Sequence, residues 1–252
     1  MNKPLLMLAI LLPVAVGQAC APVSKSRSGP AINGAPSAAG NGPPYPAMGP
    51  LAEYAIANHD EEIALARSSA PASISTDAEI LVLGANGYES AAKGKNGFVC
   101  IVQRSWAAGF DDPEFWNPKL RAPNCFNAPA VRTVLAQYLK RTEWVLAGAS
   151  KQELINRTRA AFASKVFSDP EPAAMSYMMS PHGYLSDADG HWLPHVMFFM
   201  PRTAAASWGA NLAGSPIIAR EGDENDPATI FLIPVRRWSD GSAAPVPTDH
   251  RM

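Results

Sequence analysis

Residues 175–201 read MSYMMSPHGYLSDADGHWLPHVMFFMP and hold three of the five histidines and five of the nine methionines. Two strand-like segments, Ala174–Ser180 and Pro194–Met200, flank a polar connector that is rich in turn-forming residues. Within the connector, Asp189-Gly190 is typical of a turn just ahead of a strand. We therefore expect a strand, a connector and a second strand, with the candidate site at the connector.

Alternation along these strands predicts where their side chains point. It groups two sets of three residues, each on one face of its strand: Met175, Tyr177 and Met179, and His195, Met197 and Phe199. If the strands pair, His195, Met179 and Met197 form a soft ligand set, which favours Cu(I) or could ligate haem iron. The alternative is that the methionines fill an irregular core and a backbone carbonyl holds His195.

Aromatic side chains near the connector extend this candidate site. A mostly apolar pocket with a few polar groups is the usual composition of a small-ligand site. We expect His195, supported by His191, to face a cavity, with Tyr177 and Trp192 as further ligand-binding residues. No cofactor is required by this hypothesis, and copper is the metal that it favours.

Known catalytic and metal motifs do not match the connector. His191 and His195 have the spacing of helical zinc motifs, but Pro194 lies between them and no Glu follows His191. Leu185 stands where a calcium loop needs its first Asp, and there is no Gly-x-Ser-x-Gly segment. Non-catalytic binding of a small ligand or soft metal is therefore the first hypothesis. A secreted hydrolase with a non-standard serine or histidine site is the alternative.

Composition limits the class of protein. The chain has 252 residues, of which 47% are hydrophobic, so it is long enough to bury a core in one domain or two small ones. Charged residues make up only 17%, the net charge is -1, and no basic stripe with aromatic residues is present. Nucleic acid is therefore not an expected partner.

The N-terminal residues predict export. Lys3 precedes the apolar run Leu5–Val16, which has the length of a signal peptide core and is too short to span a bilayer. Gly17 and Ala19 are the small residues that signal peptidase requires, so residues 1–19 are the predicted signal peptide. Cys20 would begin the mature chain in the periplasm or outside the cell. Ordinary secretion and lipidation of Cys20 both stay open, and a lipid would be the only membrane anchor.

The rest of the chain predicts a linker over residues 20–50, one α+β domain over residues 51–240 and a loose tail over residues 241–252. We expect an antiparallel or mixed sheet of about six strands with two or three helices packed on it. Beyond the central stretch, the expected strands are Glu79–Leu83, Phe98–Gln103, Ser215–Glu221 and Thr229–Val235, and the expected helices are Leu51–Ser69, Pro129–Leu146 and one that Ser150 opens. The first two of these strands should form a hairpin or meander. Three prolines predict that Ser105–Asn127 is irregular.

Cysteine parity predicts a disulfide. If Cys20 carries a lipid, Cys100 and Cys125 are left as an even pair in an oxidising compartment. Their bond would fix the proline-rich segment between them to the core.

Three local patterns together resemble a group of exported bacterial proteins with no assigned activity. They are Gly94-Lys95-Asn96-Gly97-Phe98-Val99-Cys100, Tyr177-Met178-Met179 and Gly190-His191-Trp192-Leu193-Pro194-His195-Val196-Met197. The resemblance covers roughly residues 65–235. It implies an exported single domain and assigns no catalytic residue.

Overall fold

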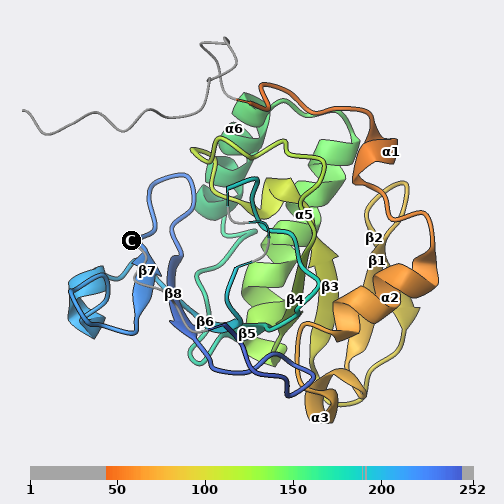
Figure 1. Ribbon diagram of the computed structural model, residues 1–252. Coiled ribbons are helices and arrows are strands. Elements are labelled where there is room, and N and C mark those ends of the chain that lie inside the picture. The colour runs from red at the N-terminus through yellow and green to blue at the C-terminus, as the bar shows by residue number, and fades with distance from the viewer. Residues whose placement is uncertain (1–43, 189, 191, 246–252) are drawn as a thin grey trace, which may run out of the picture. The chain divides into compact units, whose positions relative to one another are not determined.

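A computed structural model describes residues 44–188, 190 and 192–245 (Figure 1). The predicted signal peptide, Cys20, most of the predicted linker and His191 lie outside the described residues, as do residues 246–252 of the predicted tail. Across the described part, no helix combines the length and apolar character that a bilayer crossing requires.

The described residues form one eight-stranded mixed sheet with helices packed on it, which confirms the α+β class. The strand order is β2-β1-β3-β4-β5-β6-β8-β7. The strands are β1 (Glu79–Leu83), β2 (Tyr88–Ala92), β3 (Val99–Gln103), β4 (Ala122–Phe126), β5 (Met175–Met178), β6 (His195–Met200), β7 (Ile218–Arg220) and β8 (Thr229–Pro234). The predicted number of about six was low because β2 and β4 were not foreseen.

The predicted hairpin between β1 and β3 is wrong. β1 pairs with β2 in an antiparallel hairpin, and β3 lies on the other side of β1, parallel to it. The prediction failed because β2 was not recognised as a strand. Its sequence, Tyr-Glu-Ser-Ala-Ala, is largely exposed at the sheet edge. An edge strand of this kind buries too little apolar surface to show the usual strand pattern.

The segment Ser105–Asn127 was expected to be irregular, yet it ends in β4, all five residues of which are buried. β4 pairs with β3 along its full length, but β5 pairs only with Cys125 and Phe126. Pro123 therefore lies where β4 has a single neighbour, and proline is tolerated in strands at such positions.

The described residues hold more helices than the two or three that were predicted, but the helix ends largely follow the predicted caps. They are α1 (Leu51–Tyr54), α2 (His59–Arg67), α3 (Ala72–Ser75), α4 (Ala128–Ala130), which continues through the π-helical turn Val131–Leu135 into α5 (Ala136–Leu146), and α6 (Lys151–Ala163). Gly148 has the positive φ expected of a residue that ends a helix, and Ser150 and Glu153 form the predicted capping box. The predicted helix over residues 51–69 is divided, because Asn58 begins a new helix by accepting a hydrogen bond from Asp60 N.

The two faces of the sheet carry separate cores. On one face, Ile101, Phe126 and Met197 pack against α5 and α6 in the main hydrophobic cluster. On the other face, Ile80 and Val102 belong to a smaller cluster that includes α2. Figure 1 shows α5 running across the sheet and α2 beside β1 and β3.

A buried ion pair attaches α2 to the sheet. Arg104 Nη2 lies 2.8 Å from Glu62 Oε1, and both side chains are at most 1% exposed. Glu62 also accepts a hydrogen bond from Leu83 N, and Arg104 Nε donates to the carbonyl of Tyr54. Removing one partner of such a pair costs about 3–5 kcal/mol, because the other charge is left buried and uncompensated.

The predicted disulfide is confirmed. Cys100 of β3 and Cys125 of β4 face each other in the antiparallel register, are fully buried and are bonded. Because the bond joins neighbouring strands, it fixes β4 to the centre of the sheet.

The last residues of the predicted linker pack against the domain. Tyr45 and Met48 contact the main hydrophobic cluster, and Gly49 N donates to the Tyr54 hydroxyl at 3.2 Å. We call residues 44–50 the strap.

Candidate functional site

The strands β5 and β6 pair as neighbours, and their register determines which side chains meet. Met178 faces His195, and Ser176 faces Met197. Facing residues of an antiparallel pair lie on the same side of the sheet, with Cβ atoms about 4.5–5.5 Å apart. His195, Met197 and Met178 therefore share the face that α5 covers.

This register corrects the cluster predicted from alternation. Tyr177 faces Val196 and Met175 faces Phe198, so both lie on the sheet face opposite His195. The Tyr177 ring instead packs against Phe98, with ring centroids 6.2 Å apart. A register that differs by one residue moves a whole set of side chains to the other face, and strand alternation alone cannot fix it.

His195 is buried, with 2% of its surface exposed. Its Nδ1 lies 2.8 Å from the carbonyl oxygen of Leu193, which can only accept, so Nδ1 carries the proton. Burial lowers the pKa of His195 to about 4, although the hydrogen bond to Leu193 opposes this shift. The imidazole is therefore neutral near pH 7, and Nε2 carries the lone pair. The backbone carbonyl that the alternative, a structural core histidine, requires is therefore present, and Nε2 is the ring nitrogen that this bond leaves unprotonated.

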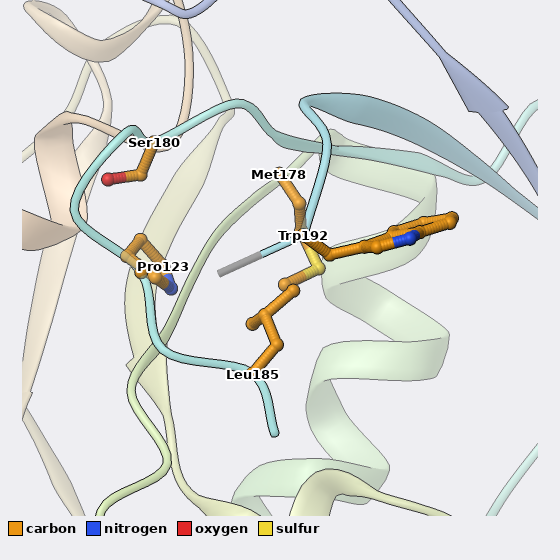
Figure 2. A pocket seen from close by; sticks show the side chains of 6 residues that line it. Pro123, Met178, Ser180, Leu185 and Trp192 are labelled. Atoms are coloured by element: carbon orange, nitrogen blue, oxygen red, sulfur yellow. The ribbon is translucent and has the colours of Figure 1, made fainter. Parts of the chain in front are cut away.

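A small cavity lies between the connector and the sheet. Met178 and Trp192 line it together with Leu185 and Ser180, and Figure 2 shows Met178 extending between Trp192 and Leu185. His195 is one contact away, because its ring meets the Trp192 ring edge-on at 4.8 Å. The cavity has room for about one water molecule. It is therefore of a size for an ion, not for a haem or another organic ligand.

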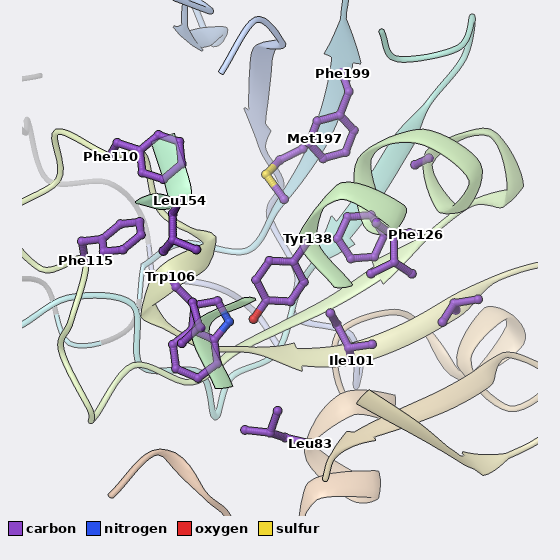
Figure 3. Packing of buried hydrophobic residues seen from close by; sticks show 14 of the residues in the cluster. Leu83, Ile101, Trp106, Phe110, Phe115, Phe126, Tyr138, Leu154, Met197 and Phe199 are labelled. Atoms are coloured by element: carbon purple, nitrogen blue, oxygen red, sulfur yellow. The ribbon is translucent and has the colours of Figure 1, made fainter. Parts of the chain in front are cut away.

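The two other predicted thioethers have different surroundings. Met197 is buried in the main cluster beside Phe199, which stacks on Phe126 (Figure 3). Met179 lies just past the end of β5, where its amide donates to the Ser69 carbonyl and its carbonyl accepts from Ser239 N. Met178, which was not in the predicted ligand set, is the methionine that faces His195.

Two polar atoms on the α5 side are buried without a hydrogen-bond partner among the described residues, namely Asn124 Oδ1 and Ser176 Oγ. Ser176 faces Met197, and the β4–β5 register continued by one residue sets Asn124 opposite Met178. Buried polar atoms are nearly always satisfied in proteins. Neither residue is in the lining of the connector cavity, so these oxygens do not bear on what the cavity holds.

A polar cluster outside the cavity holds the connector in place. Its centre is Asp187, whose carboxylate accepts from the hydroxyls of Tyr45 and Tyr184 and from Lys119 Nζ at 3.1 Å. The backbone amide of Asp187 donates to the carboxylate of Glu114 at 2.9 Å. We call these five residues the connector cluster. It joins the strap, the segment before β4 and the connector.

The hydrogen bonds of the connector cluster hold the connector in place and do not prepare its groups for acid–base chemistry. Hydrogen bonds from Tyr184, Tyr45 and Lys119 hold the pKa of Asp187 well below its usual value. The same bonds raise the pKa of both tyrosines, because ionised phenols would lie beside a carboxylate. Of the predicted Asp-Gly turn, Asp189 lies outside the described residues, while Gly190 has a φ of 63° and its amide donates to the Ser186 carbonyl. A carboxylate with this many donors is not poised for acid–base chemistry.

A larger groove lies between the strap and the turn that joins α5 to α6. Its volume is about 440 Å³. Met48, Trp116 and Val145 form apolar parts of its lining, and Lys151 lies at one end. Lys151 Nζ donates to the Phe110 carbonyl at 3.1 Å. This groove has the size of a small-molecule site, which the connector cavity lacks.

Sequence reasoning missed Met178, Asn124 and Asp187 as site residues. The motif Tyr177-Met178-Met179 drew attention to this segment, but only the register identifies Met178 as the partner of His195. Asn124 belongs to a strand that its neighbouring proline concealed. Among the described residues, no three His, Cys, Asp or Glu side chains gather as a metal-ligand group.

Together, the fold and the site define an α+β domain with a small cavity between the β5–β6 connector and the sheet. Comparison with known proteins found no family model that matches the chain, no similar curated protein and no similar solved structure.

Proposed function

We propose that the protein is an exported, non-catalytic binding module whose ligand occupies the connector cavity, which lies between the β5–β6 connector and the sheet. One observation carries this proposal. A buried and neutral imidazole, His195, adjoins a cavity that Met178 and Trp192 line. A core histidine with only a structural role needs no contact with a side chain that lines a cavity, whereas His195 contacts Trp192.

The hydrolase alternative has less support. A catalytic imidazole usually has a carboxylate on one nitrogen and a pKa near the working pH. His195 Nδ1 donates to a carbonyl, and burial lowers its pKa to about 4, which makes it a weak general base. The nearby Ser180 hydroxyl is hydrogen-bonded to the Ser68 hydroxyl at 2.6 Å.

Native mass spectrometry with elemental analysis tests the proposal on protein purified from its exported location. We expect a stoichiometric adduct on the wild-type chain, and its loss in a Met178→Leu variant. Leu has nearly the volume of Met, so this variant should fold. Met175→Leu is the matched control, because Met175 lies on the same strand but the opposite face.

The possible results distinguish a ligand in the connector cavity, a ligand in the strap groove and a hydrolase. A bound ion that Met178→Leu removes supports the connector cavity. An organic adduct that persists in Met178→Leu but is lost on substitution of Trp116 would place the ligand in the strap groove and overturn the assigned site. A serine labelled by a fluorophosphonate probe would favour the hydrolase.

Export is tested separately by intact mass. The proposal expects a mature chain that begins at Cys20, with or without a diacylglycerol group. A chain isolated from its native cell that retains Leu5–Val16 would contradict export while leaving the connector cavity untouched.

A further inference from the structure

We infer that the strap groove, which lies between the strap and the turn that joins α5 to α6, binds an apolar organic acid whose acid group contacts Lys151. This inference goes beyond the proposed function, because it concerns a second site. Its ligand comes from solution and exchanges with it, whereas the ligand of the connector cavity is expected to copurify with the protein.

The strap groove has the volume and the lining of a small-molecule site. Its volume of about 440 Å³ lies within the range of about 300–1,000 Å³ that such sites occupy. Apart from Ser150 and Lys151, its lining consists of apolar residues and glycines, namely Pro46, Ala47, Met48, Gly49, Trp116, Val145, Gly148 and Ala149. The connector cavity has room for only about one water molecule, so of these two sites only the strap groove can hold an organic molecule.

The fold holds both walls of the strap groove in place. On the strap side, Met48 packs against the main hydrophobic cluster, and Gly49 N donates to the Tyr54 hydroxyl at 3.2 Å. On the other side, Trp116 and Val145 are buried members of the same cluster. A site whose walls are already ordered loses less conformational entropy when a ligand binds.

Lys151 is the only charged residue in this lining. Its Nζ donates to the Phe110 carbonyl at 3.1 Å and lies 4.7 Å from the centre of the Phe115 ring, and no described carboxylate pairs with it. An ammonium can donate several hydrogen bonds, so these contacts leave it able to bind an anion.

The acid group of a ligand is therefore the charge that complements this groove. The carboxylate closest along the chain, that of Glu153, accepts instead from the amide and the hydroxyl of Ser150 at 2.8 Å. Because Ser150 is engaged in this way, Lys151 is the residue that we assign to the acid group.

Two fluorescent probes separate the contribution of the acid group from that of the apolar body. Anilinonaphthalene sulfonate and phenylnaphthylamine share an anilino group on a naphthalene ring, and only the first carries an anionic group. Fluorescence titration measures the affinity of each probe for the wild-type protein, Lys151→Met, Lys151→Arg and the control Lys165→Met. Lys165 is exposed just beyond the C-terminal end of α6, whereas Lys151 begins that helix. A thermal melt checks that each variant is folded.

We expect the wild-type protein to bind one equivalent of the sulfonate about tenfold more tightly than phenylnaphthylamine, because a charge-assisted hydrogen bond adds to the apolar contacts. Lys151→Met should remove this preference, while Lys151→Arg and Lys165→Met should keep it. In methionine-methyl NMR of the wild-type protein, the signal of Met48 should shift with the same saturation, and that of Met178 should stay in place.

Equal affinity of the wild-type protein for the two probes, an unchanged preference in Lys151→Met, or no saturable binding of the sulfonate would overturn the inference. Saturable binding that leaves the Met48 signal in place would also overturn it, because the probe would then lie elsewhere. The wild-type measurements decide the question even if Lys151→Met does not fold. None of these results bears on the connector cavity, which Met178→Leu tests separately.

Discussion

At the scale of single residues, burial of the His195 imidazole makes the free energy of unfolding depend on pH. It is 2% exposed, and its charged form would lose water without gaining an anionic partner. The unfolded chain binds a proton on this ring with an ordinary pKa of 6.5, whereas the folded protein resists until about pH 4. Between these values the unfolded state holds more protons, so stability falls as the pH falls.

We therefore predict that wild-type protein loses free energy of unfolding from pH 7 to pH 4, by on the order of 3 kcal/mol from this residue. His195→Gln should lack this component. Urea denaturation of both proteins at several pH values measures the difference, which separates His195 from the other titrating groups. Parallel curves for the two proteins would show that the buried ring does not resist protonation.

At the scale of elements, the connector cluster holds the connector together with backbone hydrogen bonds between Tyr184 and Arg121 and between Gly190 and Ser186. Asp187→Asn removes the charge that attracts Lys119 and weakens acceptance from Tyr45 and Tyr184. We predict faster hydrogen exchange and faster proteolysis within residues 181–188, with little change in the global melting temperature.

Asp223→Asn is the control for this substitution. Asp223 accepts backbone hydrogen bonds from Asn225 and Asp226 in the turn before β8. Its replacement should leave exchange in the connector unchanged. If Asp187→Asn also leaves it unchanged, the cluster does not anchor the connector.

The disulfide between Cys100 and Cys125 should contribute to the stability of the fold. It closes a loop with a sequence separation of 25 residues and joins β3 to β4. Replacing both Cys100 and Cys125 by Ala should lower the free energy of unfolding by about 3.5 kcal/mol in the chain-entropy model. Chemical denaturation of the double variant measures this loss. A loss below about 1 kcal/mol would mean that the strand pairing alone restricts the loop.

At the scale of the whole molecule, the sequence predicted the class of fold and most element positions. Helix caps and apolar strands have local signals, as the capping box of Ser150 and Glu153 illustrates. Two strands were not predicted from the sequence, because β2 is a polar edge strand and β4 contains Pro123. The parallel pairing of β1 and β3 has no local signal, since it depends on where β2 lies.

The candidate site, like the fold, was predicted only in part from the sequence. Of the predicted site residues, Trp192 lines the connector cavity, His195 contacts Trp192 and Met197 lies in the main hydrophobic cluster, while the disulfide followed from cysteine parity. It placed Tyr177 beside His195, whereas the register sets Met178 there. Pairing register depends on contacts between segments that the pattern of a single segment does not encode.

Methionine-methyl NMR during titration with Cu(I) tests the central claim, that the β5–β6 connector cavity is the binding site, most directly. Selective ¹³C labelling gives one signal per methionine, and Met→Leu variants assign the signals, all in the Cys20→Ser background, because a free thiol would itself bind Cu(I). We predict that the methyl signal of Met178, which lines the cavity, shifts and saturates at one equivalent, while the signals of Met48 and Met175 stay in place. Saturation with shifts confined to other methionines, or no saturable shift in any signal, would contradict it.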